Sequence, residues 1–231
     1  MRHALTIREH LDVSRYGPRR IRGDNGSVSM PAIPLGESAA PSHRDRLVAD
    51  GRDRASWLRA RSRGVTGTDA AQLASARSVD RVVRDKIRGS GFTGNAFTDH
   101  GRRREPELAG WAGRVYGMTA SSALFHAPAR RDHLATPDGL RERDGRLELC
   151  EIKTTNSLWR SIPRSYLRQV WWQQYVLGAE RTLVVWEQHE NFVPVADEPQ
   201  CRWVDRDDEQ IAQLVTLADL LLLGMRSLMH Q

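Results

Sequence analysis

The sequence has few cysteines, few lysines and no long apolar run, and each shortage excludes a class of protein. Cys150 and Cys201 are the only cysteines, so one chain supplies neither a disulfide scaffold nor a four-thiolate zinc or iron–sulfur centre. The most apolar run, residues 220–223, is far shorter than the roughly eighteen residues that cross a membrane. No secretion-type apolar segment follows the N-terminus. We therefore expect a cytoplasmic protein with no membrane partner.

Positive charge is plentiful, yet nearly all of it is arginine. The chain has 35 lysines and arginines against 29 acidic residues, which gives a net charge of +6 and a pI near 10.0. Only Lys86 and Lys153 are lysines. A basic excess fits a polyanionic partner such as nucleic acid, although a GC-rich genome would produce the same arginine bias. Lysine is thus rare enough that the surroundings of Lys153 become informative.

The most informative segment is residues 135–153. Asp144-Gly145 is a strong two-residue hairpin signal, because both positions tolerate the positive φ that a type I′ turn requires. That turn fixes the register of the hairpin and predicts Asp138 directly across from Glu151, with Cβ atoms about 5 Å apart. A bulge next to Asp138 would shift this register. The sequence therefore predicts a pair of facing carboxylates.

Facing carboxylates repel each other and weaken a sheet that has no use for them. A divalent cation reverses the sign of this interaction, because hard cations such as Mg²⁺ bind between carboxylate oxygens. Lys153 follows Glu151 by two residues and shares its strand face. Its ammonium would then lie beside the metal, where it could hold a water or stabilise charge on a phosphate. This combination predicts a metal-dependent site that cleaves phosphodiesters.

Composition and apolar periodicity divide the chain into an extension and a domain. Residues 1–45 combine glycine and proline with serine and arginine, so we expect a flexible N-terminal extension. Residues 46–231 alternate helical and strand patterns, which predicts one α/β domain. The expected helices span about residues 43–61, 68–73, 95–116, 163–177 and 208–228, and the expected strands about 120–127, 182–186 and 192–195.

A glycine-bearing turn near residue 64 adds a candidate anion site. Thr68 stands at the start of a short helix, where a hydroxyl and free backbone N–H groups bind anions readily. Arg59, Arg61 and Arg63 precede it. An ordinary helix cap with solvated arginines before it also explains these residues, and the segment taken alone favours that explanation.

Two further helical segments carry candidate polar residues. Glu105 ends an arginine run, and that pattern by itself is typical of a solvated face. Pro106 follows it and predicts a kink or a new helix start at that point. Tyr166, Gln169 and Gln173 form one stripe along the helix expected at 163–177, which is otherwise largely apolar. Glutamines in that setting indicate a role other than solvation.

Together these features resemble the PD-(D/E)xK nucleases and, within them, the phage lambda-exonuclease or YqaJ-type viral recombinase group. The resemblance covers about residues 55–190. The matching segments are Trp57-x-x-x-Arg61 with Gly64-Val65-Thr66-Gly67-Thr68-Asp69, Gly101-x-x-x-Glu105-Pro106, Ala135-Thr136-Pro137-Asp138-Gly139, Glu151-Ile152-Lys153, and Tyr166-Leu167-Arg168-Gln169 with Gln173. An isolated Asp…Glu-x-Lys arises often by chance, whereas five elements in order are far more specific.

The resemblance implies a restriction-endonuclease-like core, in which helices flank a central mixed β-sheet. It also implies a Mg²⁺-dependent 5′-to-3′ exonuclease on linear double-stranded DNA, with Mn²⁺ able to substitute. Such enzymes leave 3′ single-stranded tails for phage-type recombination. The implied partners are DNA ends, a single-strand annealing protein and further copies of the chain in a ring-shaped homotrimer. A phage-encoded member would act in the cytoplasm of the bacterial host.

The resemblance also implies roles for individual residues. The family's metal ligands correspond to Glu105, Asp138 and Glu151, and its catalytic lysine corresponds to Lys153. The glutamine next to the active site corresponds to Gln169, and the residues that contact the 5′-phosphate correspond to Arg61 and Thr68. This chain has one more residue between Trp57 and Gly64 than the lambda-type sequence. That difference leaves Arg59 and Arg63 as alternatives to Arg61.

Two other functions remain open at the level of sequence. A DNA endonuclease or a single-strand nuclease on the same scaffold would carry the same hairpin. A basic DNA-binding protein whose carboxylates are simply solvated would need no metal and would leave the strand intact. The facing carboxylates argue against this second alternative, because a simple binder would not place them beside phosphate.

Overall fold

The computed structural model describes residues 42–88 and 94–229, so nearly all of the extension expected at 1–45 lies outside the described residues. In chain order the described elements are η1 (His43–Arg46), β1 (Leu47–Ala49), α1 (Arg54–Arg63), α2 (Gly67–Gln72), α3 (Ala76–Arg88), α4 (Ala96–Tyr116), β2 (Thr119–Ala120), β3 (Leu124–Ala127), β4 (Arg130–Ala135), β5 (Gly139–Arg143), β6 (Arg146–Thr155), α5 (Arg164–Leu177), β7 (Arg181–Glu190), β8 (Val193–Pro194), β9 (Gln200–Asp205) and α6 (Asp208–Met229).

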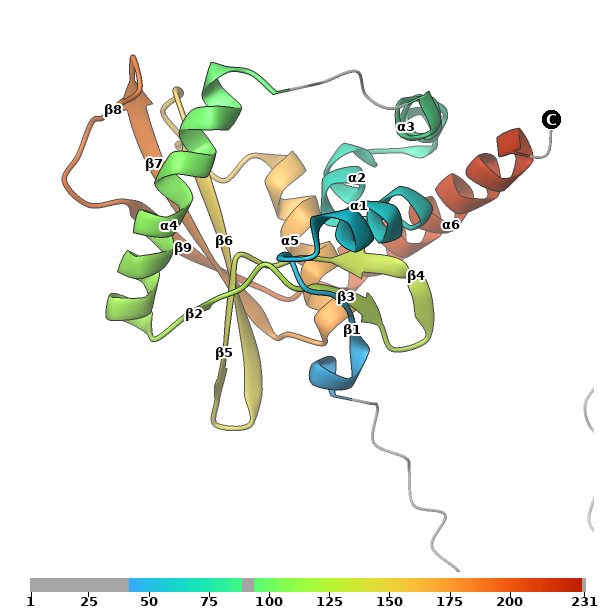
Figure 1. Cartoon of the computed structure of the whole chain (residues 1–231), viewed down its shortest axis with the longest axis horizontal. Helices are drawn as coiled ribbons and strands as arrows, with labels where there is room; N and C mark the ends of the chain where they lie inside the picture. The colour runs from blue at the N-terminus through green and yellow to red at the C-terminus, as the bar shows by residue number, and fades with distance from the viewer. Residues whose placement is uncertain (1–41, 89–93, 230–231) are drawn as a thin grey trace, which may run out of the picture. The chain divides into compact units, whose positions relative to one another are not determined.

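The strands form two sheets (Figure 1). The larger sheet has the order β2-β5-β6-β7-β8, and β9 also pairs with β7. Only β6 and β7 run parallel within it, so this sheet is mixed. The smaller sheet, β1-β3-β4, is antiparallel. This arrangement confirms the predicted α/β class with helices around a mixed sheet.

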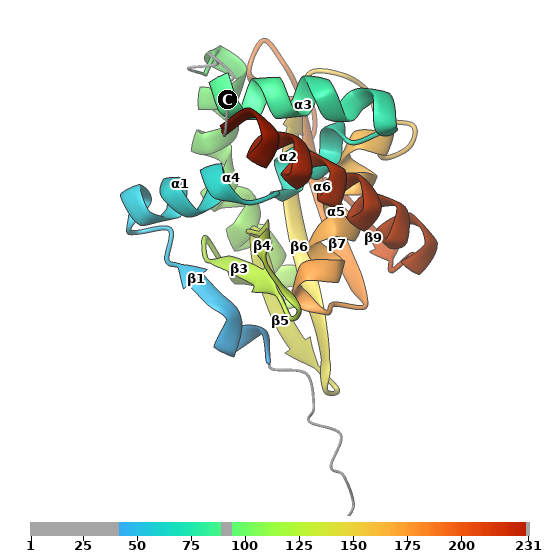
Figure 2. The same ribbon diagram turned by 90° about the vertical axis from the view of Figure 1, so that its right-hand side faces the viewer.

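Helices cover both faces of the larger sheet because its central strands are apolar on both sides. On one face, α4 packs Leu108 and Ala112 against Ile152 and Leu183. On the other face, α5 packs against the sheet, where Val170 belongs to the cluster that contains Val184 and Trp186. Further out, α6 packs on α5 and lies beside α3 (Figure 2). β6 is therefore buried between two helices, and it carries the predicted glutamate and lysine into that layer.

The hairpin of β5 and β6 has the predicted register. Asp144 (φ 52°) and Gly145 (φ 75°) both adopt the left-handed conformation that the turn requires. Pairing then runs without a shift from the turn to Gly139 and Cys150. A backbone hydrogen bond of 3.1 Å runs from the Asp138 N–H to the carbonyl of Cys150, the residue that already pairs with Gly139. The regular pairing therefore ends one residue before Asp138. Asp138 and Glu151 line the same cleft, but they do not form the direct cross-strand pair that the turn chemistry predicts.

The helix predicted at residues 43–61 is wrong. The structure has η1, β1 and the shorter helix α1 there instead. The Asp53 side chain accepts a 3.0 Å hydrogen bond from the N–H of Ser56 and starts α1 at residue 54. Leu47 and Leu58, two of the apolar residues on which that prediction rested, are 53% and 49% exposed. A local capping signal thus overrides a weak apolar period, which the intervening Gly51 also interrupts.

η1 is attached to the body of the domain through Arg46. This side chain is buried and donates hydrogen bonds to the backbone carbonyls of His126, Val176 and Leu177. The predicted boundary between extension and domain, at residues 45 and 46, therefore falls inside η1.

Helices α4, α5 and α6 match their predictions, whereas the sequence analysis predicted no helix where α3 lies. α4 passes through Pro106 without a break, whereas the sequence predicted a kink or a new start there; the proline lies on the exposed side of the helix. By length and composition alone α6 would qualify as a membrane span, and core helices of soluble proteins pass the same test. Its apolar stripe lies in the main core cluster and includes Ile211, Leu214 and Ala218.

We predict that Gly64→Ala destabilises the fold. A Cβ at residue 64 would lie 2.5 Å from the Asp132 carbonyl oxygen and 2.7 Å from Leu134 Cδ1. Because the backbone around Asp132 would have to move, we expect the free energy of unfolding to fall by about 1–3 kcal/mol. Gly110→Ala in α4 is the matched control, because its added Cβ meets only the flexible end of Arg114. Urea unfolding followed by tryptophan fluorescence measures both variants. An unchanged midpoint for Gly64→Ala would contradict the packing described.

Candidate active site

One cleft of about 490 Å³ gathers the residues that the sequence singled out. Its walls come from α1, α2, α4, the β5–β6 hairpin and α5. The lining includes every predicted site residue, namely Arg61, Thr68, Glu105, Asp138, Glu151, Lys153 and Gln169. Segments separated by more than a hundred residues in sequence therefore converge on one hollow.

Glu151 is the most buried acid of the cleft, at 1% exposure. Lys153 Nζ and Gln169 Nε2 both donate to its Oε1 atom. Gln173 Nε2 donates to Oε2 at 2.7 Å and lies 3.3 Å from the carbonyl oxygen of Thr136. A buried carboxylate is costly unless it is paired. Three donors from β6 and α5 supply that pairing.

Asp138 lies beside Glu151 at the start of β5. Its Oδ2 accepts a 2.7 Å hydrogen bond from the N–H of Ile152, which fixes the side chain against β6. Burial raises the pKa of Asp138 well above its ordinary range, and the charge of Glu151 raises it further. Lys153 and the Ile152 N–H oppose this rise. The carboxylates of Asp138 and Glu151 thus repel each other.

Lys153 and Glu105 complete the acidic end of the cleft. Burial alone would lower the pKa of Lys153, but the charges of Glu151 and Asp138 outweigh it and hold that pKa above the ordinary value. Glu105 projects from α4 into the cleft and keeps contact with solvent. The pKa of Glu105 is raised above its ordinary value, chiefly because surrounding protein atoms partly remove the carboxyl from water. The charge of Lys153 opposes this rise, and the charge of Glu151 adds to it. Glu105 is therefore electrostatically part of the same group of charges.

The basic end of the cleft is formed by α1 and α2. Arg61 Nη2 lies 3.4 Å from Thr68 Oγ1, so the structure brings together the two residues that the resemblance pairs. Arg59 instead donates to Ser56 within its own helix, and neither Arg59 nor Arg63 lines the cleft. Among the three alternatives, the geometry favours Arg61.

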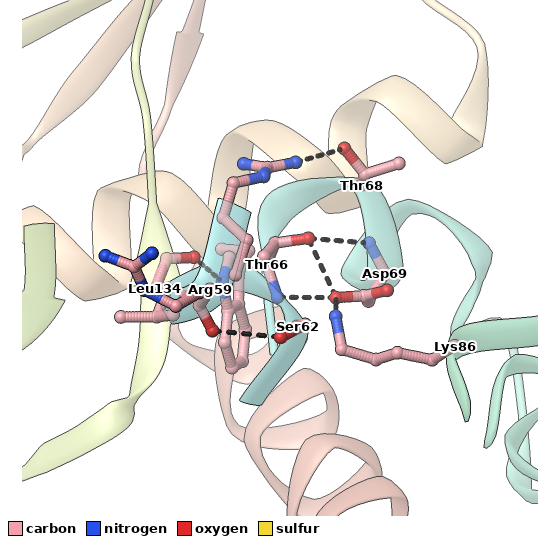
Figure 3. Close-up of polar contacts among 9 residues, drawn as sticks. Arg59, Ser62, Thr66, Thr68, Asp69, Lys86 and Leu134 are labelled. Atoms are coloured by element: carbon pink, nitrogen blue, oxygen red, sulfur yellow. Dashed lines mark hydrogen bonds and ion pairs between the residues drawn. The ribbon is translucent and has the colours of Figure 1, made fainter. Parts of the chain in front are cut away.

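A buried polar network holds Thr68 in place (Figure 3). Asp69 Oδ2 accepts hydrogen bonds of 2.8 Å from both the N–H and the Oγ1 of Thr66, which caps α2. The same oxygen accepts a 2.6 Å bond from Lys86 Nζ of α3. The second lysine of the chain therefore anchors the start of α2, a role that its sequence context did not predict.

Several cleft residues were not predicted as site residues. Gln173 carried a signal, since it lies one turn beyond Gln169 on the same stripe. Arg54 and Arg102 lay in arginine-rich segments without any distinguishing pattern. The side chains of Gln173 and Thr136 also hold buried oxygen atoms, Oε1 and Oγ1, without a hydrogen-bond partner among the described residues. These oxygens leave acceptor capacity inside the cleft.

The donor set fits a hard cation in its chemistry. Asp138, Glu151 and Glu105 offer carboxylate oxygens, the ligands that Mg²⁺ prefers. Their arrangement is not that of a closed metal centre: within residues 42–88 and 94–229, no three His, Cys, Asp or Glu side chains form a metal-binding group. The oxygens of Glu151 are engaged instead by Lys153 and two glutamines.

Comparison with known proteins places this fold among the exonucleases. An alkaline exonuclease (LHK-Exo) from Laribacter hongkongensis matches with a TM-score of 0.61 and 24% identity, over 74% of this chain and 92% of its own. A phage-related exonuclease from Haemophilus somnus matches with a TM-score of 0.56 and 11% identity, over 72% and 95%. At these identities the likeness establishes the fold. A search of curated proteins found no match.

The family follows from the sequence itself. The model of the YqaJ-like viral recombinase domain matches residues 56–180, more than half of the chain. The protein belongs to this family, as the five ordered motifs predicted. The matched range includes all seven predicted site residues.

We predict that Lys86→Met destabilises α2. The variant leaves Asp69 buried beside α3 without its counter-charge, and removal of one partner of such a pair costs about 3–5 kcal/mol. Hydrogen exchange at the α2 amides, together with urea unfolding, reports the loss. The double variant Asp69→Asn/Lys86→Met removes both charges and should recover part of the stability. Equal stability of Lys86→Met and wild type would show that the ion pair contributes nothing.

Proposed function

We propose that this protein is a Mg²⁺-dependent 5′-to-3′ exonuclease that degrades linear double-stranded DNA and leaves 3′ single-stranded tails for phage-type recombination. The observation that carries the proposal is the set of Glu105, Asp138, Glu151 and Lys153 in a single cleft that also contains Arg61 beside Thr68. Membership of the viral recombinase family and the exonuclease fold support it.

The acidic end of the cleft supplies the chemistry in this proposal. Mg²⁺ bound there would polarise the scissile phosphate and lower the pKa of a bound water. Asp138 and Glu151 would hold it, with Glu105 contributing from α4. Gln169 and Gln173 would keep Glu151 oriented through their hydrogen bonds, and Lys153 would position the attacking water. Lys153 donates to Glu151 Oε1 in the structure, so its ammonium lies beside the carboxylates that would hold the cation.

The basic end supplies the choice of substrate. Arg61 and Thr68 would bind a 5′-terminal phosphate, since a guanidinium and a hydroxyl are strong donors to phosphate oxygens. Contacts of this kind track the backbone and carry no sequence information. We also propose, from the family resemblance, a single-strand annealing protein as partner and a homotrimer as the assembled form. LHK-Exo has been solved in complex with dAMP, a nucleotide that carries one phosphate monoester.

We predict that Glu151→Gln and Lys153→Met each reduce DNA digestion by at least about a hundredfold, because each removes a charge that the reaction needs. Release of acid-soluble nucleotides in Mg²⁺ measures the rate, and circular dichroism confirms the fold. Glu142→Gln is the matched control, since this exposed carboxylate lies on the same hairpin outside the cleft. Wild-type digestion by Glu151→Gln would exclude this cleft as the active site.

A choice of DNA substrates separates the proposed function from its alternatives. Linear duplexes with 5′-phosphate or 5′-hydroxyl ends, and a closed circular duplex, are incubated with Mg²⁺ or with EDTA. The exonuclease digests linear DNA in Mg²⁺ only, favours phosphorylated ends and leaves circles intact. Cleavage of circles would identify an endonuclease on the same fold. Binding without any cleavage, with Mn²⁺ also tried, would identify the non-catalytic DNA-binding protein.

A further inference from the structure

Two arginines of α1 stack on the same indole in the wall of the cleft. The guanidinium carbon of Arg54 lies 4.5 Å from the ring centroid of Trp57, and that of Arg61 lies 4.2 Å from it. Both arginines line the cleft. Arg54 precedes Trp57 by three residues and Arg61 follows by four, so each lies one helical turn from the indole. The ring thus holds two extended cations in defined positions.

Neither of these cations is neutralised by a neighbouring carboxylate. Within the part of the chain that the structure describes, ion pairs engage Arg52, Arg102 and Arg104, but none involves Arg54 or Arg61. Burial lowers the pKa of Arg61; Asp69 opposes that effect and the charge of Arg54 adds to it. Stacking on Trp57 offsets part of this repulsion. The arrangement leaves room for an anion of more than one negative charge.

We propose that Arg54 is a further residue of the end-binding pocket, where it holds a 5′-terminal phosphate monoester together with Arg61 and Thr68. This inference rests on the proposed function and extends it to a residue outside the family motif. A phosphate monoester carries about −1.5 to −2 charges at pH 7, whereas an internal phosphodiester carries about one. Two unpaired guanidinium groups match the monoester, so Arg54 determines the preference for phosphorylated ends.

The neighbouring arginines do not offer the same contact. Arg52 is paired with Asp50 at 3.1 Å, and Arg59 donates to Ser56 at 2.7 Å; neither lines the cleft. Arg102 does line the cleft, but it is paired with Asp99 at 3.3 Å. Arg54 is exposed and therefore reachable by a DNA end. It is the arginine of α1 best placed to join Arg61.

The test is a binding measurement in EDTA, where neither metal nor cleavage contributes. Fluorescence anisotropy compares short duplexes that differ only in a 5′-phosphate or a 5′-hydroxyl end. Wild type should bind the phosphorylated end roughly tenfold more tightly, since hydrogen bonds to charged groups contribute strongly. Arg54→Ala should lose most of this ratio. Arg59→Ala, on the same helix and outside the cleft, is the matched control and should keep it.

A change of pH gives a second readout that a purely structural role of Arg54 would not affect. The second ionisation of a phosphate monoester lies near pH 6, so the wild-type ratio should fall as the pH drops from about 7.5 to 5.5. In Arg54→Ala the ratio should be low at both values. Thermal unfolding of each variant confirms that α1 remains folded.

Other outcomes would overturn the proposal. Equal weakening of both duplexes by Arg54→Ala would make this residue a general backbone contact. An absence of end preference in wild type would exclude the pocket, while digestion of linear DNA would still support the nuclease. Conversely, a preference that Arg54→Ala abolishes, in a protein that digests no DNA, would support the pocket and overturn only the nuclease.

Discussion

The buried charge of Glu151 is the constraint on which this structure depends. A carboxylate removed from water must be paired and hydrogen-bonded, or it becomes neutral. Here the ammonium of Lys153 comes from the same strand face, and two amides come from α5. The pKa of the nearby Asp138 is raised by its own burial and further by the charge of Glu151. The acidic end of the cleft is therefore one coupled unit.

Satisfying Glu151 also positions the basic end. Its two glutamine donors are one turn apart, so α5 must run across β6 with that stripe facing the strand. α2 packs closely on the same stripe, where a Cβ at Gly67 would come within 3.2 Å of Gln169 Cγ. Arg168 secures the contact by donating to the Ala71 carbonyl of α2. The distance between the acidic and basic ends is thus set by packing through α5.

Structural features with a local cause could be predicted from the sequence, whereas features set by tertiary packing could not. The hairpin register followed from a two-residue turn and held to Gly139. The prediction of one helix at 43–61 was wrong because the Asp53 cap, which starts α1 at residue 54, outweighs a weak apolar periodicity. Lys86 could not be assigned, since its partner lies seventeen positions away in another helix. Residue chemistry predicted the two hairpin carboxylates and Lys153, and the family resemblance supplied the other members of the cleft. The three hydrogen bonds that Glu151 accepts depend on tertiary packing.

The cleft holds two like-charged pairs, one at each end. Asp138 and Glu151 repel each other at one end, and Arg54 and Arg61 repel at the other. In the proposed function, a cation relieves the first repulsion and a terminal phosphate relieves the second. Both pairs line one cleft, so in this proposal the charge bound at one end would affect binding at the other. If the two sites are coupled in this way, metal and DNA would strengthen each other's binding by the same factor, because coupling between two sites is reciprocal. The repulsion within each pair would then favour binding of a phosphorylated DNA end when the metal is in place.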